Sequence, residues 1–215
     1  MNRSSARARS PFAAIALCLG LAAFPSAVLA PPALAMVNGA DTVRSLYDTL
    51  LATMRNGAAL GPRGRYMQIE PMVRRVFDIP FMTQLAVGPE WAGLSEAQRQ
   101  QVSQAFERYI AAIYAERFDS YSGERLQVLG EQQSPGGVII TSQIVKSNGE
   151  PVHINYLMRQ NGGTWQIADV YLGGTISELA TRRSEFASIL RTQGINGLIQ
   201  TLNTKANNLA AARAS

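Results

Sequence analysis

The hydrophobic pattern changes its period twice along the chain, and this change constrains the fold most. Up to about residue 121, and again after residue 177, apolar residues recur every three or four positions, as in amphipathic helices. Between residues 125 and 172 short apolar runs are bounded by turn residues, which is typical of β-hairpins. We therefore predict helices over 41–121, a sheet over 125–172 and helices over 177–209. This order predicts an α+β domain with an antiparallel meander of about four strands.

Turn residues separate the four expected strands, and side-chain alternation assigns their faces. In the third strand Val152, Ile154, Tyr156 and Met158 share one apolar face. In the fourth strand the alternation places Trp165, Ile167, Asp169 and Tyr171 together, and the two faces differ less. An oily sheet face can belong to a filled core or to a hollow pocket, and both readings stay open. The expected strands are 125–130, 138–145, 152–159 and 164–172, separated by Ser134–Gly137, Ser147–Glu150 and Asn161–Gly163.

The expected helices are marked by capping residues and by helix breakers. The first spans 41–56 with Asp41 or Thr42 as its cap, and the second spans 66–77 with a kink or restart at Pro71. Asp78 caps a short helix from Ile79. A capping box of Ser95 and Gln98 opens the longest helix, which we expect to reach about Tyr121. Two C-terminal helices, 177–192 and 197–209, are separated at Gly194.

The first 35 residues predict a secretory signal peptide. A basic start is followed by a 13-residue apolar run, Phe12–Phe24, which is shorter than the roughly 20 residues that cross a bilayer. Ala33-Leu34-Ala35 has the small-residue pattern of a cleavage site, so we expect cleavage after Ala35. An uncleaved membrane anchor is the alternative. The basic residues are Arg3, Arg7 and Arg9.

Removal of residues 1–35 from the 215-residue chain leaves 180 residues without cysteine, because the single cysteine is Cys18. We expect a periplasmic or secreted domain that uses no disulfide. Of the 20 Lys and Arg residues three lie in the removed segment, so 17 basic residues oppose 15 acidic ones in the rest. This near-neutral balance removes the compositional argument for nucleic-acid binding.

The sequence lacks the residue sets of common catalytic and metal sites. His153 is the only histidine, so neither a Ser-His-Asp triad nor a zinc site has its usual ligands. The glycine pairs fit turns and not a phosphate-binding loop. Asp169, near the end of a strand, is the one candidate for a general base. The pairs Arg74-Arg75 and Arg182-Arg183 are solvated or meet an anionic headgroup or an acidic partner. We predict no catalytic residue, metal or cofactor.

Six short segments occur in an order that resembles one family, the MlaC-type periplasmic lipid-binding proteins, also called the toluene-tolerance auxiliary family. The resemblance extends from Phe77 to about Leu202. Residues 117–120, 155–159 and 171–183 are most similar to its hopanoid-associated branch, HpnM. The segments are Phe77-Asp78 followed by Met82, Gly88-x-x-Trp91 before Ser95, Tyr121–Glu124, Asn155–Arg159, Gly163-x-Trp165-x-Ile167-x-Asp169-Val170, and Ser184–Leu190.

The resemblance implies an NTF2-like sheet with helices that enclose a deep apolar pocket, in a single domain spanning 36–215. It implies a non-catalytic, monomeric carrier of phospholipid or hopanoid. Such a carrier shuttles lipid across the periplasm between inner- and outer-membrane transport complexes. From the sequence we expect ten side chains to line the pocket. From the helices these are Phe81, Leu85, Phe106, Ile110 and Tyr114, and from the sheet Ile140, Ile154, Tyr156, Met158 and Ile167.

Two other functional classes remain alternatives. NTF2-like domains include small-molecule enzymes that use an acid or a tyrosine in an apolar pocket, and Asp169 and Tyr156 are the candidates for these parts. An interaction adaptor with a filled core and arginine-bearing helices is the other class. A large continuous cavity separates the carrier and the enzyme from the adaptor.

Overall fold

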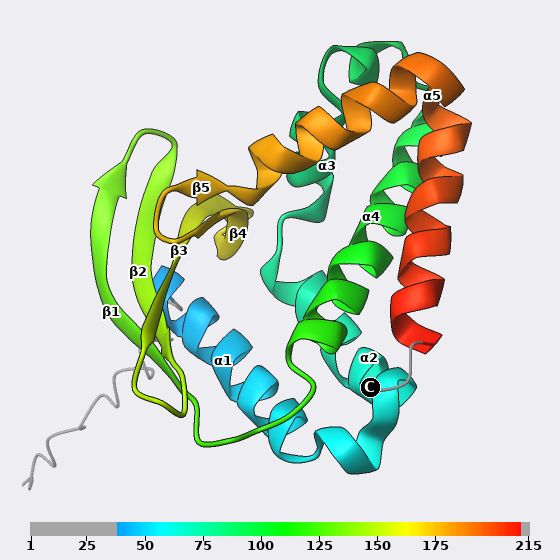
Figure 1. Cartoon of the computed structure of the whole chain (residues 1–215). Helices are drawn as coiled ribbons and strands as arrows, with labels where there is room; N and C mark the ends of the chain where they lie inside the picture. The colour runs from blue at the N-terminus through cyan, green and yellow to red at the C-terminus, as the bar shows by residue number, and fades with distance from the viewer. Residues whose placement is uncertain (1–37, 212–215) are drawn as a thin grey trace, which may run out of the picture. The chain divides into compact units, whose positions relative to one another are not determined.

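A five-stranded antiparallel sheet forms the central part of the chain (Figure 1). The computed structural model describes residues 38–211, so the expected signal peptide and its cleavage site after Ala35 lie outside the described residues. The strands follow one another in space as they do in sequence, which confirms the meander. The two-residue fifth strand was not predicted. The strands are β1 (Arg125–Ser134), β2 (Gly137–Val145), β3 (Pro151–Asn161), β4 (Thr164–Leu172) and β5 (Ile176–Ser177).

Tight turns join the strands. Between β3 and β4 only Gly162 and Gly163 intervene, and both have positive φ, 56° and 83°. Two-residue hairpin loops of this kind match the right-handed twist of the strands, and residues without a Cβ adopt them at little cost. The glycine pair therefore sets the register of β3 against β4.

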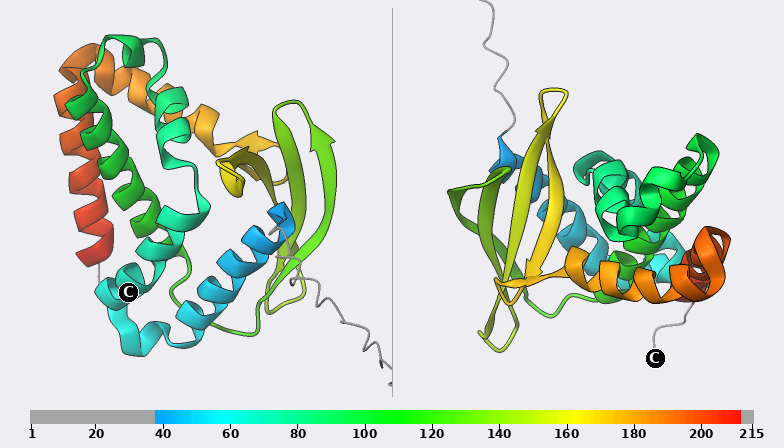
Figure 2. Two further views of the ribbon diagram at one scale, coloured as in Figure 1. Left: turned by 180° about the vertical axis from the view of Figure 1, so that it is seen from behind. Right: turned by 90° about the horizontal axis from the view of Figure 1, so that it is seen from above.

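Helices form a layer beside the sheet (Figure 2). Helix α1 contacts strands β1 to β4, whereas α2, α3 and α5 reach the sheet at β4. The sheet is thus covered in two different ways, by α1 directly and by the remaining helices from the β4 side. The helices are α1 (Gly39–Arg55), α2 (Gly57–Val76), α3 (Ile79–Val87), the 3-10 helix η1 (Gly88–Gly93), α4 (Glu96–Arg117) and α5 (Glu178–Ala211).

Two expected helix starts are confirmed by their hydrogen bonds, whereas the second helix begins at Gly57 and not at residue 66 as predicted. Asp78 accepts from the Phe81 amide at 3.3 Å, and Ser95 and Gln98 form the reciprocal capping box. Helix α1 begins earlier than predicted, because Asn38 accepts from the Asp41 amide at 2.8 Å. The expected end of α4 is also wrong, since the helix stops at Arg117, four residues before Tyr121.

Two glycines interrupt the helices. Gly194 (φ 66°, ψ −171°) breaks α5 where the sequence predicted a boundary. In α2 the break lies at Gly61 (φ 60°, ψ 178°) and not at Pro71, which was expected to kink the helix. Pro62 directly follows that break, in the first turn of a helical segment, where the missing amide hydrogen of proline costs least. Among residues 38–211, no helix is both long and apolar enough to cross a membrane.

A β-bulge resolves the ambiguous faces of β4. Leu157 pairs with Asp169 but Met158 pairs with Ile167, so Ala168 has no cross-strand partner. Beyond the bulge the alternation is reversed, and Val170 lies opposite the inward-facing Tyr156. The face expected from simple alternation is therefore wrong after Ile167.

Candidate functional site

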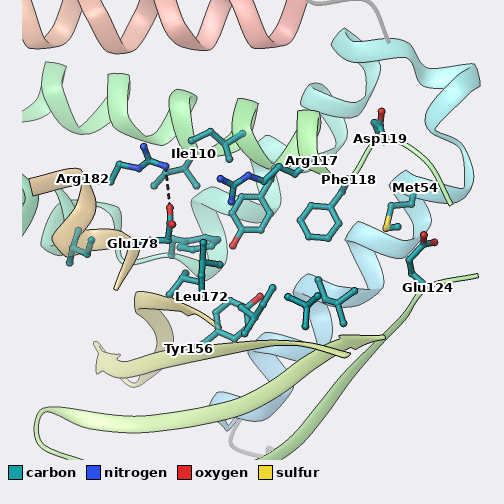
Figure 3. Close-up of a pocket in the computed structure, with 18 of the residues that line it drawn as sticks. Met54, Ile110, Arg117, Phe118, Asp119, Glu124, Tyr156, Leu172, Glu178 and Arg182 are labelled. Atoms are coloured by element: carbon teal, nitrogen blue, oxygen red, sulfur yellow. Dashed lines mark hydrogen bonds and ion pairs between the residues drawn. The ribbon is translucent and has the colours of Figure 1, made fainter. Parts of the chain in front are cut away.

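A cavity of about 560 Å³ lies between the sheet and helices α4 and α5 (Figure 3). This volume lies within the roughly 300–1,000 Å³ of pockets that enclose small organic ligands. Most of its lining is apolar. The apolar and aromatic side chains are Met54, Phe77, Met82, Phe106, Ile110, Ile113, Tyr114, Phe118, Ile144, Val152, Ile154, Tyr156, Val170, Leu172 and Leu179.

The sheet contributes one wall through cross-strand neighbours. Ile144 of β2 lies opposite Val152 of β3, and Ile154 lies opposite Leu172 of β4. Alternation brings the β2 and β3 side chains to the same face, and the bulge brings Leu172 to it as well. Six strand residues from three strands thus form one continuous apolar surface.

Helix α4 contributes the opposite wall with a single stripe. Five residues on one face of this helix line the cavity, and all but the adjacent pair Ile113 and Tyr114 follow one another at intervals of three or four positions. They are Phe106, Ile110, Ile113, Tyr114 and Arg117. The stripe changes character along the helix, from aromatic and aliphatic to hydroxyl-bearing and then to cationic. The α4 wall of the cavity is therefore apolar at one end and polar at the other.

At the inner end of the cavity the charges are paired with one another. Arg182 of α5 is 14% exposed and binds Glu178 at 3.1 Å and Glu185 at 3.0 Å. Its guanidinium also donates to the Tyr109 hydroxyl at 3.4 Å. Two carboxylates face one guanidinium here, so the group carries one negative charge in excess.

The other end, which we call the mouth, faces solvent. It is lined by Arg117, Ser120 and Lys146, which are exposed, and by Asp119 and Glu124. Figure 3 shows Asp119 and Glu124 at the end of the cavity opposite Arg182, with Arg117 between the two ends. Lys146 pairs with Glu150 at 3.0 Å, outside the lining. Within residues 38–211, no carboxylate lies within 4.0 Å of the Arg117 guanidinium.

The mouth is braced by a buried arginine. Arg65 is 4% exposed, and its guanidinium donates to the carbonyl oxygens of Ala115 at 2.9 Å and Gly57 at 3.1 Å. Ala115 lies in the last turn of α4, where carbonyl groups lack helical partners and attract cations. Gly57 packs so closely on Asp119 that a Cβ there would overlap the Asp119 carbonyl oxygen. The start of α2 thus fixes the loop that follows α4.

Three tyrosine hydroxyls are buried beside the cavity. Ser142 donates its only hydrogen to the Ile154 carbonyl, so in the 2.6 Å bond between Tyr47 and Ser142 the tyrosine is the donor. Burial raises the pKa of Tyr114 and the pKa of Tyr156 well above the usual value, so both phenols stay protonated. The cavity therefore contains hydrogen-bond donors within its apolar wall.

The structure brings together five of the ten side chains that were expected to form a pocket. Phe106, Ile110, Tyr114, Ile154 and Tyr156 all line the cavity.

Phe81 and Leu85 of α3 do not line the cavity. The Phe81 ring lies under the Arg159 guanidinium at 3.8 Å, and Leu85 is 39% exposed. Met82 of the same helix is the one that lines the cavity. The predicted pocket-facing position differs from the observed one by one residue, which corresponds to a rotation of about 100° on a helix with 3.6 residues per turn.

Ile140, Met158 and Ile167 also do not line the cavity, because they lie in a filled part of the core. All three are fully buried. A Cβ on Gly39 would meet Met158 at 3.2 Å and Ile140 at 3.4 Å, so the start of α1 packs directly on these two side chains. Ile167 lies where the α2–α3 junction joins the sheet, since its carbonyl accepts from the Asp78 amide at 2.9 Å.

Several lining residues were missed although the sequence contains a signal for them. Ile113 and Arg117 continue the α4 stripe by one turn, and Val152 shares the inner face of Ile154 in β3. Val170 and Leu172 had no usable signal, because the bulge that turns them inward is not evident in the sequence pattern.

The candidate general base lies outside the cavity. The Asp169 carboxylate accepts from the Val170 amide at 2.7 Å, the Ser177 hydroxyl at 2.6 Å and the Leu179 amide at 3.1 Å. These bonds join β4 to the start of α5 and use the carboxylate structurally. His153 is exposed. In the part of the chain that the structure describes, no three His, Cys, Asp or Glu side chains gather as metal ligands.

The chain is 25% identical over 126 residues to the intermembrane phospholipid transport system binding protein MlaC of Haemophilus influenzae. The match covers 56% of this chain and 58% of that protein, so the chain spans little more than half the length of this relative.

A solved structure has the same fold. It is the phospholipid-binding protein from Ralstonia solanacearum, in complex with a phospholipid, and it matches with a TM-score of 0.67 and 24% sequence identity. The match covers 80% of this chain and 99% of that one. The α+β architecture is therefore shared over nearly the whole of the solved protein.

A family model gives the widest sequence match. The model described as MlaC protein matches residues 44–204, which include all the strands, α2 to α4 and most of α1 and α5. The expected resemblance is confirmed, and the chain belongs to the MlaC family.

Proposed function

We propose that this protein is a lipid carrier that encloses the apolar part of a phospholipid in the cavity between the sheet and α4. The observation that carries the proposal is the cavity itself, with an apolar wall from both layers and a polar, solvent-facing mouth. An amphiphile fits such a site with its chains inside and its headgroup at the mouth. The names of the Haemophilus and Ralstonia proteins support the same ligand class.

The need for a carrier follows from the hydrophobic effect. Two acyl chains with about 15 methylenes each cost roughly 24 kcal/mol to expose, at about 0.8 kcal/mol per methylene. Taken as an activation barrier, this cost allows escape at on the order of 10⁻⁵ per second, about once per day. A cavity that replaces water around the chains with apolar side chains removes most of this barrier.

The proposal extends to compartment and partners. With residues 1–35 as a cleaved signal peptide, the mature protein is exported to the periplasm, as a monomer without cofactor or catalytic activity. There it exchanges lipid with transport complexes of the inner and outer membranes. The cargo is a phospholipid, and a hopanoid is the alternative cargo. The position of Asp169 outside the cavity gives no support to the alternative of an enzyme.

A charge placed in the apolar wall tests the proposal. Ile154→Arg puts a guanidinium among the acyl chains, whereas the matched control Leu129→Arg puts it on a β1 position that is 53% exposed. We expect the first variant to lose most lipid uptake from phospholipid vesicles and the control to keep it, with both folded by circular dichroism. A folded Ile154→Arg protein that takes up lipid like the control would contradict the proposed site.

A further inference from the structure

Residues 120–124, which we call the mouth strap, lead from the end of the α4 region into β1 and border the mouth of the cavity. Ser120 and Glu124 line the mouth. Figure 3 shows Glu124 at the end of the cavity opposite Arg182. A ligand that moves between the cavity and solvent at this end therefore passes beside the strap.

The chain is fixed immediately before the strap. Phe118 stacks on Tyr114 of α4, with 5.7 Å between the ring centroids. Gly57 packs against the carbonyl oxygen of Asp119 so closely that a Cβ would overlap it. The strap thus starts from a firm anchor formed by the end of α4 and the start of α2.

The strap itself is bonded only locally. Within residues 38–211, its side-chain hydrogen bonds go to Asp119 or to the strap: the Ser120 hydroxyl donates to the Asp119 carboxylate at 3.0 Å, and the Ser122 amide donates to the Glu124 carboxylate at 2.7 Å. Gly123 has a φ of 107°, which favours glycine. Segments with exposed residues and few bonds to the rest of a protein open at low cost in free energy.

A cation–π contact holds the strap from outside. The Arg55 guanidinium lies over the ring of Tyr121, 5.2 Å from its centroid. Arg55 is the last residue of α1, and the preceding Met54 is buried and lines the cavity, so the arginine is carried by a fixed element. Tyr121 is 40% exposed. A cation–π contact at an exposed site contributes about 0.5–1 kcal/mol, so it favours the observed position without locking it.

The charges at the mouth give the strap a reason to move. The cations belong to the walls, because Arg117 is the last residue of α4 and Lys146 directly follows β2. The Glu124 carboxylate belongs to the strap. A phosphate group that passes the mouth is attracted by the two cations and repelled by this carboxylate. Displacement of the strap takes Glu124 away from the phosphate and widens the mouth.

We propose that the mouth strap moves aside when a lipid enters or leaves the cavity, and that Arg55 is a positioning residue that holds the strap in place through Tyr121. The inference rests on the proposed function and adds to it a pair of residues that governs the rate of lipid exchange. The contact lies outside the cavity and is made whether or not lipid is bound. Its loss should therefore speed entry and exit alike and leave the equilibrium occupancy unchanged.

Exchange kinetics test the positioning role. We would load the protein from phosphatidylcholine vesicles with a trace of chain-labelled fluorescent phosphatidylcholine, and follow release into unlabelled vesicles by fluorescence. Arg55→Met and Tyr121→Leu should each exchange about 2- to 5-fold faster than the wild type at equal final occupancy. The control Arg44→Met changes an exposed arginine near the start of α1 and should exchange like the wild type. Release is measured only from protein that holds lipid, so unfolded molecules do not contribute.

Two further variants separate the strap from a general effect of the substitutions. Tyr121→Phe keeps the ring and should exchange like the wild type. Cys18, in the expected signal peptide, is the only cysteine of the chain, so the double variant Arg55→Cys, Tyr121→Cys offers the only two thiols of the mature protein. After loading with lipid and joining of these thiols by a short bismaleimide, the protein should retain its lipid. The same variant without the crosslinker should release lipid faster than the wild type.

The outcomes distinguish this inference from the proposed function. Unchanged rates in Arg55→Met and Tyr121→Leu, or free release from the crosslinked protein, would overturn the role of the strap and leave the carrier function intact. Faster exchange with a lower final occupancy would place Arg55 in lipid binding and overturn its positioning role. Absence of lipid uptake by the wild type would overturn both. Faster exchange at equal occupancy, normal exchange in Tyr121→Phe and retention after crosslinking support the assignment.

Discussion

The apolar face of the sheet is filled over one half and hollow over the other. In the filled half, Ile140 and Met158 are in contact with the start of α1. In the hollow half, Ile144, Val152 and Ile154 face α4 across the cavity. The side chains of the two halves have the same character and alternate with the same period. The two halves differ in the helix that faces them. Helix α1 packs directly against the strands of the filled half, whereas α4 faces the hollow half without contacting the strands closely.

The comparison teaches that residue type alone does not distinguish a core from a binding pocket. A cavity persists where surrounding elements hold the walls apart. Here α4 is held by contacts away from the sheet, including the bonds of Arg65 to the carbonyls of Ala115 and Gly57 and the packing of Phe106 on Phe186. If the packing differs in this way, equivalent truncations in the two halves should lower the free energy of unfolding by different amounts.

The largest effect is expected in the filled half. Met158→Ala removes a fully buried side chain and should lower the free energy of unfolding by about 3 kcal/mol, within the usual 2–5 kcal/mol for such truncations. Ile144→Ala in the hollow half should cost about 1 kcal/mol, since one side of Ile144 already lacks protein neighbours. Urea unfolding of the lipid-free proteins measures both. Equal losses would mean that the two halves are packed alike.

A smaller loss is expected at the brace of the hollow half. Arg65→Met should cost about 2 kcal/mol, because it leaves the buried carbonyls of Ala115 and Gly57 without their donors. Arg63→Met, at an exposed position of the same helix, is the matched control and should change little. Thermal unfolding of the two variants compares them. Equal melting temperatures of Arg65→Met and Arg63→Met would contradict a stabilising role for the buried arginine.

The tyrosine hydroxyls of the hollow half should have the smallest effect on the free energy of unfolding near neutral pH. Their effect should grow as the pH becomes alkaline. The pKa of Tyr114 and the pKa of Tyr156 are raised by burial from the ordinary 10.0, so above pH 10 the unfolded chain releases these protons first. Stability should therefore be complete below pH 10 and fall as the pH rises further.

The variant Tyr156→Phe should flatten the fall of stability above pH 10, whereas Tyr121→Phe, at an exposed position, should not. Urea unfolding at pH 9, 10 and 11 provides the comparison. An unchanged slope in Tyr156→Phe would show that water reaches this hydroxyl in the folded protein.

The sequence predicted the fold more fully than the site. Local signals such as the Ser95–Gln98 capping box and the Gly162-Gly163 turn depend on neighbouring residues, so they could be recognised. The early start of α1 at Asn38 and the short strand β5 were missed, because several polar residues nearby can cap a helix and two residues carry no period.

The site was predicted in part, for reasons that lie in tertiary structure. Phe106, Ile110 and Ile154 follow from helical and strand periodicity and do line the cavity. Val170 was hidden by the bulge at Ala168, and Met158 was assigned to the pocket because the position of α1 cannot be derived from local pattern. The half of the apolar sheet face that α1 covers depends on contacts between residues far apart in the sequence.

Whether the protein carries lipid is tested by mass spectrometry of lipid extracted from the wild-type protein, purified from its native compartment without detergent. We expect phospholipid in stoichiometric amount. Protein that contains no lipid, and that also takes up none from phospholipid vesicles, would contradict the carrier function.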